Sequence, residues 1–322
     1  MAPRRPLHDI IVFYSLALPA SLIILILLLL LLSQLGVAIP VLGVQGISTY
    51  TTTVWRPTYE PPQPTTIWLP TLEPPQRGAW YGLLPAIWGT LVSAITAIIL
   101  GLTFTIALVV FIEEIAPRRV REVFSTIVDL MAGLPTVLYG VWGLAFLGPL
   151  LHKYVMDPVS SYLGIIPLFS CEPLSGATVF TAGVLLSIMI TPFMVALVQE
   201  SYRSIPFTLK EAAWSLGMTR FEYVRLNLSM ILPSIASAIL LGFGRASSET
   251  AAVTLVVGNA VNIGFCIFTP AYTISSLIAN QFTESQDFPY MLNALFAGGL
   301  ILLVIGLVVN SIGIILLRRV RF

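Results

Sequence analysis

Residues 208–250 read TLKEAAWSLGMTRFEYVRLNLSMILPSIASAILLGFGRASSET. The first half is polar and has the composition of a helical loop, whereas the second half is an apolar helix that contains Arg245 and Glu249. A loop that faces water is therefore joined directly to a membrane helix with two charges. This arrangement suggests that force enters the molecule through the first half and that an ion passes along the second.

Two helix starts are encoded in the polar half. Thr208 and Glu211 have the T-x-x-E spacing of a capping box, which predicts a helix that begins at Thr208. Gly217 predicts the end of that helix, because glycine commonly follows a last helical turn. Thr219 and Glu222 repeat the box, so a second short helix should follow at once. The pair is either a rigid projection that meets a partner or a solvated helix pair without one.

The composition places the chain among membrane proteins. Of its 322 residues 57% are hydrophobic and 10% are charged, against roughly 25% charged residues in soluble domains. The net charge of +1 gives no indication of nucleic-acid binding. Two cysteines and two distant histidines, His8 and His152, predict no metal site. The phosphate-binding motif G-x-x-x-x-G-K-[ST] is absent, so the chain is not expected to bind ATP by that motif.

Six apolar stretches are long enough to cross a membrane, which takes about 20 residues. The first has no small-residue cleavage site and is expected to remain as an anchor. The six stretches are Ile10–Leu32, Leu83–Phe111, Phe124–Leu151, Ala177–Val198, Met230–Val257 and Tyr290–Leu317.

The loops divide the chain and set its orientation. We expect an anchor helix at 1–43, an extracytoplasmic segment rich in Pro and Thr at 44–79, and a core of five spans at 80–322 with a polar loop at about 199–229. Of the 16 Lys and Arg residues, twelve flank the spans on one side, three lie on the other, and one is within a span. The positive-inside rule then predicts that both termini and the polar loop are cytoplasmic. The Pro/Thr segment is either a solvated spacer or a contact for an external partner.

The third apolar stretch contains an interruption. Pro135 lies between two glycines in a predicted span, and Tyr139 follows it. Proline removes a backbone donor, so a kink is expected here, with a possible gating role for Pro135 and Tyr139. Asp129 precedes the kink, and it is expected to cap the cytoplasmic end or to pair with an arginine there, with a site role as the alternative.

Several of these motifs resemble a known family. Glu211-Ala212-Ala213 followed by Gly217 resembles the EAA loop of ABC importer permeases, which forms a coupling helix against the ATPase subunit. The runs GLPTVLYGVWGLAFLGPLL at 133–151, EEIAPRRVR at 113–121 and GFGRASSETAAV at 242–253 are similar to permeases of phosphate-specific importers, the PstC type in particular. The resemblance covers roughly residue 82 to the C-terminus.

The resemblance implies an all-α membrane protein of six transmembrane helices with the type I ABC importer permease architecture. It implies a cell-membrane subunit that forms half of a phosphate pathway and is not itself an enzyme. The implied partners are a second permease subunit, two ATPase subunits that hold ATP and Mg²⁺, and an extracytoplasmic phosphate-binding protein. Glu211, Ala212, Ala213 and Gly217 would couple to the ATPase. No cofactor is expected in this chain.

The two charges within the fifth stretch are costly. Arg245 lies about 22 Å into this stretch at 1.5 Å per residue, and a centred Arg costs about 2.5–3.5 kcal/mol on insertion scales. Arg245 and Glu249 are four residues apart, so one interpretation is a self-neutralising pair on a helix face. The other is an oxyanion pathway, in which arginine supplies charge and donors and the small neighbours, Ser248 among them, leave room.

Three further functions stay open on sequence alone. The same machine for molybdate, sulfate or phosphonate would keep the EAA loop and change only the pathway residues. A secondary transporter would be expected to have internal repeats and several buried carboxylates, and neither is apparent. A sensor or assembly subunit would have no reason to place Arg245 within the membrane.

The two cysteines follow different spans on the same predicted side. Cys171 follows the third apolar stretch and Cys266 follows the fifth, so both are expected outside the cytoplasm. Disulfides persist in such a compartment. The alternatives are one bond between the two loops or two separate buried thiols.

Overall fold

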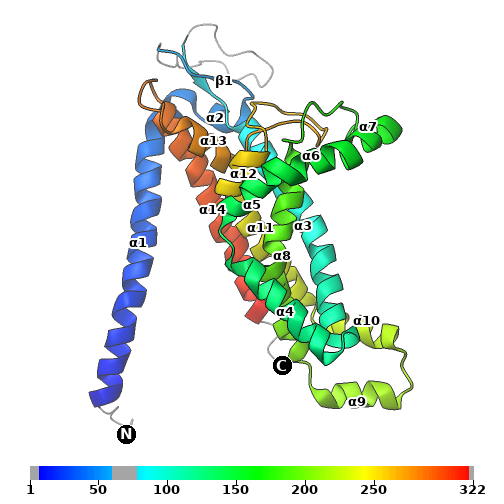
Figure 1. Ribbon diagram of the computed structural model, residues 1–322. Coiled ribbons are helices and arrows are strands. Elements are labelled where there is room, and N and C mark those ends of the chain that lie inside the picture. The colour runs from blue at the N-terminus through cyan, green and yellow to red at the C-terminus, as the bar shows by residue number, and fades with distance from the viewer. Residues whose placement is uncertain (1–6, 60–77, 319–322) are drawn as a thin grey trace.

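The computed structural model describes residues 7–59 and 78–318, and the Pro/Thr-rich stretch at 60–77 lies outside them. The described part is an elongated helical bundle with one two-stranded antiparallel sheet, as Figure 1 shows. The elements are α1 (Leu7–Gln45), α2 (Ser48–Thr51), β1 (Trp55–Arg56), β2 (Trp80–Tyr81), α3 (Leu84–Val110), the π-helical turn η1 (Phe111–Ile115), α4 (Arg118–Gly133), α5 (Thr136–Trp142), η2 (Gly143–Leu147), α6 (Gly148–Leu151), η3 (His152–Met156), α7 (Asp157–Leu163), α8 (Val179–Arg203), α9 (Phe207–Ser215), α10 (Arg220–Met230), α11 (Leu232–Ser248), α12 (Ala251–Val256), α13 (Ile274–Gln281) and α14 (Met291–Arg318).

The described helices provide between four and six membrane spans. Four are long and apolar enough to cross a membrane by themselves: Ser15–Gln45 of α1, Leu84–Ile115, α8 and α14. Two further pairs of helical segments qualify as spans when each pair is taken together, and each pair is bent at a short break. The segment Thr136–Leu163 turns by 96° from α4, and α11 turns by 64° from α10. Each of the six predicted stretches overlaps one of these segments, although the stretch Met230–Val257 covers α11 and α12 and only the last residue of α10.

The kink expected at Pro135 is present, whereas the predicted span Met230–Val257 is wrong as a continuous helix. The stretch Phe124–Leu151 breaks at Pro135, because proline lacks a backbone N–H and disfavours helical geometry in the residue before it. The stretch Met230–Val257 breaks at Glu249, whose backbone is extended with φ −67° and ψ 129°. Before this break the Ser248 hydroxyl donates to the carbonyl oxygens of Gly244 and Arg245, a local interaction that competes with helix continuation.

The core of the bundle is the contact between α3 and α8. Small residues let their backbones approach closely, as is typical of packed membrane helices. Ala94 and Ala97 on α3 are fully buried. A Cβ added to Gly183 on α8 would lie 2.6 Å from the Cβ of Thr96, so α8 passes at this point without room for any side chain. These two helices therefore form a closely fitted pair on which the rest of the fold is arranged.

Helix α1 contacts the rest of the molecule mainly through α14. The Asn293 side-chain nitrogen donates to the carbonyl oxygen of Val37 at 2.6 Å. Towards its beginning α1 diverges from the bundle, and its side chains from Leu22 to Leu30 are exposed apolar groups that lipid would cover (Figure 1). The helix continues to Gln45, well past the predicted end of the first apolar stretch at Leu32.

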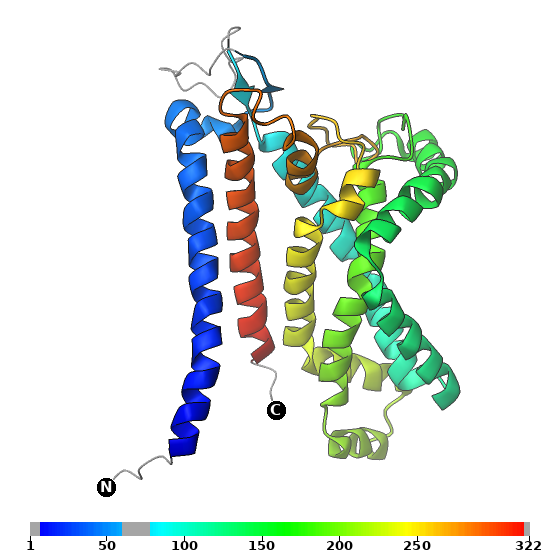
Figure 2. The same ribbon diagram turned by 60° about the vertical axis from the view of Figure 1, so that its left-hand side comes forward.

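The two ends of the bundle carry different elements. Helices α9 and α10 lie at the same end as the beginning of α1 and the end of α14, as Figure 2 shows. The small sheet, α7, α13 and the long loops on either side of Cys171 and Cys266 lie at the opposite end. The polar loop is thus at the same end of the bundle as the beginning of α1 and the end of α14, and its cytoplasmic location stays a prediction.

Candidate functional site

Helix α9 begins one residue before the predicted start. Its N-cap is Pro206, without a side-chain cap, and Phe207 is the first helical residue. The predicted capping box of Thr208 and Glu211 is therefore wrong, because Thr208 already lies within the first turn. Proline fixes φ near the helical value and has no N–H to leave unsatisfied, so it can start a helix without help from threonine.

Helix α9 ends just before Gly217, as the sequence predicted. Gly217 adopts φ +73°, and its N–H donates to the carbonyl oxygen of Trp214 at 3.0 Å. The N–H of Met218 reaches back to the carbonyl oxygen of Ala213 at 3.2 Å. These two bonds make a Schellman motif, which satisfies carbonyl groups that the helix end would leave free. No atom lies within 4 Å of a Cβ added to Gly217, so the requirement for glycine here is conformational.

The second box, at the start of α10, is confirmed. The Glu222 N–H donates to the Thr219 hydroxyl oxygen at 3.3 Å, and the Glu222 carboxylate accepts from the Thr219 N–H at 2.8 Å. The bond from the backbone N–H, and a second from the Thr219 hydroxyl, lower the pKa of Glu222 below its usual value. The two short helices are thus separately terminated.

Side chains hold α9 against α10 and leave one surface uncovered. The ring of Trp214 stacks on that of Tyr223 with a centroid distance of 5.8 Å, and the Lys210 ammonium lies 5.4 Å from the same tyrosine ring. Ala213 is buried, whereas Glu211 and Ala212 are exposed. The most exposed apolar side chains of this segment are Phe207, Leu216 and Phe221, and Leu209, Trp214 and Leu226 are exposed to a smaller extent. The pair is therefore a rigid projection with an apolar surface that the chain itself does not cover.

Arg245 and Glu249 do not form the expected pair. Helix α11 ends at Ser248, so Glu249 is no longer on the helical face that carries Arg245. The Arg245 guanidinium lies over the ring of Phe193 from α8, 5.6 Å from its centre, and makes no ion pair with any residue that the structure describes. Arg245 is exposed on the single chain and stands in the last turn of α11, where the helix dipole favours a cation.

Glu249 occupies the break between α11 and α12. One carboxylate oxygen accepts from the N–H of Ala252 at 3.3 Å, and the Glu249 carbonyl oxygen accepts from the Ser275 hydroxyl of α13 at 2.7 Å. Helix α11 is only about 25 Å long at 1.5 Å per residue, less than the roughly 30 Å of a bilayer core. Non-helical backbone at membrane depth is tolerated where protein buries it or where it lines a water-filled cavity.

The break at Pro135 is closed by a tyrosine. The Tyr139 hydroxyl donates to the carbonyl oxygen of Met131 at 2.9 Å, and the same oxygen accepts a longer bond of 3.4 Å from the Leu134 N–H at the end of α4. Beyond the break, α5 packs closely on α12, since a Cβ added to Gly140 would lie 2.9 Å from the Cα of Ala252. The two interrupted segments thus meet. Asp129 is exposed on α4 and has neither an ion pair nor a capping role among the described residues.

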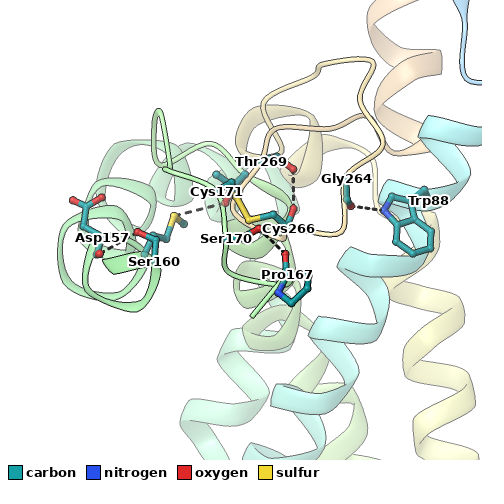
Figure 3. The surroundings of a disulfide bond; sticks show 11 residues. Trp88, Asp157, Ser160, Pro167, Ser170, Cys171, Gly264, Cys266 and Thr269 are labelled. Atoms are coloured by element: carbon teal, nitrogen blue, oxygen red, sulfur yellow. Dashed lines mark hydrogen bonds between the residues drawn. A yellow bond between two sulfur atoms is a disulfide. The ribbon is translucent and has the colours of Figure 1, made fainter. Parts of the chain in front are cut away.

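Cys171 and Cys266 are joined as a disulfide, which Figure 3 shows with its surroundings. Their Cα atoms are 6.1 Å apart, within the range that a disulfide allows. The Ile267 N–H donates to the carbonyl oxygen of Leu168 beside the bond, at 3.1 Å. The Trp88 indole N–H donates to the Gly264 carbonyl oxygen at 3.0 Å, which fastens the second loop to α3.

A cluster that the sequence interpretation missed lies between the spans and the short helices. Glu113 and Glu114, which we name the acidic clamp, occupy η1 at the end of α3. Glu113 accepts from the Gln199 side chain at 2.6 Å and from Arg203 at 2.8 Å. Its side chain is only 9% exposed. Adjacent acids directly after an apolar span were visible in the sequence, but only the fold shows which helices they hold.

Comparisons with known proteins agree with this geometry. Residues 114–322 match the family of binding-protein-dependent transport system inner membrane components. The chain is 42% identical over 284 residues to the probable phosphate transport system permease protein PstC of Methanocaldococcus jannaschii, covering 88% of this chain and 85% of the relative. It is 32% identical over 317 residues to PstC of Xylella fastidiosa, covering 95% and 90%. The chain belongs to the PstC-type permease family.

Solved structures share the fold of this permease at low sequence identity. A methionine ABC transporter, MetNI, aligns with a TM-score of 0.52 at 19% identity and covers 74% of this chain and 96% of that one. A bacterial ABC transporter that imports alginate aligns with a TM-score of 0.52 at 21% identity, covering 74% and 80%. The permease is therefore a multi-pass membrane protein with the architecture of ABC importer permeases.

Proposed function

We propose that this chain is the permease subunit of an ATP-driven importer of inorganic phosphate, and that it forms half of the translocation pathway. The observation that carries the proposal is the state of Arg245, an exposed cation at the end of an apolar helix without an acidic partner among the described residues. An unneutralised arginine within a membrane span costs about 2.5–3.5 kcal/mol, so it needs a compensating role. The relatives named as phosphate transport permeases support phosphate as the anion.

The geometry of the guanidinium suits an oxyanion. The Arg245 guanidinium carbon lies 5.6 Å from the centre of the Phe193 ring, and the five N–H donors of the guanidinium lie in the plane of that group. Arginine is therefore free to donate two parallel bonds to neighbouring oxygens of one phosphate. The Ser248 hydroxyl, one turn further along, is exposed on the same helix end and is a second polar group for the pathway. Glu249 would hold the break open and accept a bond from a protonated phosphate oxygen.

A second permease subunit is required to complete this site. Arg245 is exposed on the single chain, and lipid is a poor environment for an exposed charge. A partner permease would cover this side of α11 and enclose a polar path between the two chains. Pro135 and Tyr139, at the other interrupted segment, are candidates for a gate, and Asp129 remains a weaker one.

Coupling to ATP would pass through α9. Its exposed surface combines Glu211 and Ala212 with the apolar side chains of Phe207 and Leu216, and buried apolar contact of this kind stabilises protein interfaces. Two ATPase subunits, one for each permease, would bind ATP and Mg²⁺ and carry out hydrolysis, so this chain contributes no catalytic residue. An extracytoplasmic binding protein would deliver phosphate at the opposite end.

The proposal is tested by assembly and transport. The permease is co-expressed with a second permease and an ATPase, purified as a complex and reconstituted in liposomes. Phosphate-loaded binding protein should stimulate ATP hydrolysis, and labelled phosphate should accumulate only when ATP is present. Accumulation of molybdate, sulfate or a phosphonate in place of phosphate would show that the importer carries a different oxyanion. Uptake driven by an ion gradient without ATP would indicate a secondary transporter and contradict the proposal.

A further inference from the structure

Four helices converge on the acidic clamp at the end of the bundle that carries α9. Glu113 holds Gln199 and Arg203 of α8, as described above, and its backbone carbonyl accepts from Arg121 of α4 at 2.9 Å. Its neighbour Glu114 is turned towards a different set of partners. Both side chains are largely buried, 9% and 13% exposed, so their bonds are weakly screened by water.

Glu114 links the short helices to α8. One carboxylate oxygen accepts from the Tyr202 hydroxyl at 3.1 Å, and the other lies 3.8 Å from the Lys210 ammonium of α9. The Tyr202 oxygen in turn accepts from the Asn227 side chain of α10 at 3.1 Å. Asn227 is buried, so this chain of bonds is enclosed by protein. Helices α9 and α10 therefore cannot shift without changing the position of the Tyr202 hydroxyl or breaking these bonds.

The same helix α8 carries the platform under Arg245. Phe193 lies nine residues before Tyr202, about 14 Å along the helix at 1.5 Å per residue. Pro192 directly precedes Phe193 within α8. A proline inside a helix removes one backbone hydrogen bond and commonly bends the axis, so this is the point where α8 yields most easily. Movement of the Tyr202 end would accordingly turn α8 at the level of the phenylalanine ring.

We propose that α8 is a lever, in which the Glu114–Tyr202 contact transmits displacement of α9 and α10 to the Phe193 ring and so to Arg245. The inference rests on the proposed function, because it assigns the ATPase to α9 and the anion to Arg245. Glu114 and Tyr202 touch neither ATP nor anion and act as positioning residues. Without this contact, α9 pulls on α8 only through the chain at 204–206, so the ATPase moves α9 with a smaller displacement of α8 and hydrolysis proceeds without matching transport.

Exchanging the charges of Glu114 and Lys210 distinguishes a role in coupling from a role in stability alone. Glu114→Lys places two cations together, and Lys210→Glu places two acids together, so each single variant should lose the contact between α9 and the clamp. The double variant restores an opposite pair, and the Tyr202 oxygen is able to accept from the new lysine. The measured quantity is the amount of phosphate imported per ATP hydrolysed. In each single variant this ratio should fall at least about fivefold, which is the lower end of typical coupling effects. In the double variant the ratio should return to within about twofold of wild type.

The control is Glu200→Lys, at an exposed position on the same end of α8 with no ion pair among the described residues. Glu200→Lys should leave the amount of phosphate imported per ATP hydrolysed unchanged. Single variants that lower only the amount or the melting temperature of the complex, with a wild-type ratio, would overturn the lever. Failure of the double variant to recover would overturn it as well.

A second measurement does not depend on which anion is carried. Ala196→Cys introduces a thiol at an exposed position of α8 between Phe193 and Tyr202, and a spin label attached there reports movement of the helix. In the assembled complex, addition of ATP should change the spectrum, and Glu114→Lys should abolish that change. An equal response in both complexes would overturn the lever even if phosphate transport is intact. The opposite result is also informative. If Glu114→Lys abolishes the spectral change but the wild-type complex takes up no phosphate, only the proposed cargo is contradicted.

Discussion

The guanidinium of Arg245 lies over the ring of Phe193, with 5.6 Å between the guanidinium carbon and the ring centre. The arginine comes from α11 and the phenylalanine from α8, so this contact fixes a charge between two spans. A cation over an aromatic face is attracted by about 0.5–2 kcal/mol, which is too weak to neutralise it within a membrane. The arginine thus remains available for an anion, and this availability is the basis of the first prediction.

Replacement of Arg245 is expected to stop transport without loss of assembly. Arg245→Gln should reduce phosphate uptake to less than about a tenth of the wild-type rate, since each tenfold loss corresponds to about 1.4 kcal/mol. Arg245→Lys should also be strongly impaired, because an ammonium does not replace a planar, bidentate donor. Uptake by reconstituted complexes measures both. Arg318→Gln, which removes an exposed charge at the end of α14, is the control, and wild-type uptake in Arg245→Gln would show that the residue has only a structural role.

Gly217 should tolerate asparagine far better than valine. The position requires φ +73°, and a non-glycine residue in that region costs about 1–2 kcal/mol, with asparagine the best tolerated. Gly217→Val should leave the permease inserted but should raise ATP consumption per phosphate imported, because α9 no longer ends correctly. Gly217→Asn is the matched control. Equal coupling in both variants would mean that the end of α9 does not matter.

Glu211→Lys tests the surface of α9 rather than its fold. Glu211 is exposed and has no bond to another side chain among the described residues, so the change should not affect the melting temperature. Co-purification of the ATPase subunit and the coupling ratio should both fall. An unchanged yield of the complex with normal transport would place the ATPase contact elsewhere.

The bond across the Pro135 break should be worth a measurable amount of stability. Tyr139→Phe deletes the shorter of the two hydrogen bonds to the Met131 carbonyl oxygen and leaves the longer one from the Leu134 N–H, and a net hydrogen bond contributes about 0.5–1.5 kcal/mol. The melting temperature should fall by a few degrees. Tyr162→Phe, at a tyrosine that is 85% exposed, should have no effect. Equal melting temperatures for the two variants would show that the Tyr139 hydroxyl adds no stability beyond the bond from the Leu134 N–H.

The disulfide is accessible to a direct chemical test. Alkylation of the denatured, unreduced protein should label no cysteine, and prior reduction should label both Cys171 and Cys266, as measured by intact mass. Loss of the bond should destabilise the protein by up to about 5 kcal/mol, because the sequence separation is 95 residues. Two labelled cysteines without reduction would rule the bond out.

Local signals in the sequence predicted local features well. Gly217 correctly predicted the end of α9, and the Thr219–Glu222 box correctly predicted the start of α10. Both succeeded because turn and cap geometry depends on a few adjacent residues. The start of α9 was misjudged, because Pro206 and Thr208 both favour helix initiation and the proline lies first. Hydropathy located the six apolar segments but gave no angle at the breaks.

Features that depend on tertiary contacts were beyond the sequence. The break at Glu249 follows an apolar run without proline, and its backbone is satisfied by Ser275 from a distant helix. The expected pairing of Arg245 with Glu249 assumed an uninterrupted helix. Likewise the acidic clamp joins Glu114 to Tyr202, 88 residues away along the chain. Spacing within one helix carries no information about such partners.

Uptake of labelled phosphate into liposomes that contain the complete complex, the binding protein and internal or external ATP tests the account most directly. Phosphate should accumulate only with ATP on the side of α9, and Arg245→Gln should abolish accumulation while the complex stays intact. Accumulation that is independent of ATP, or that proceeds at the wild-type rate in Arg245→Gln, would contradict the central claim.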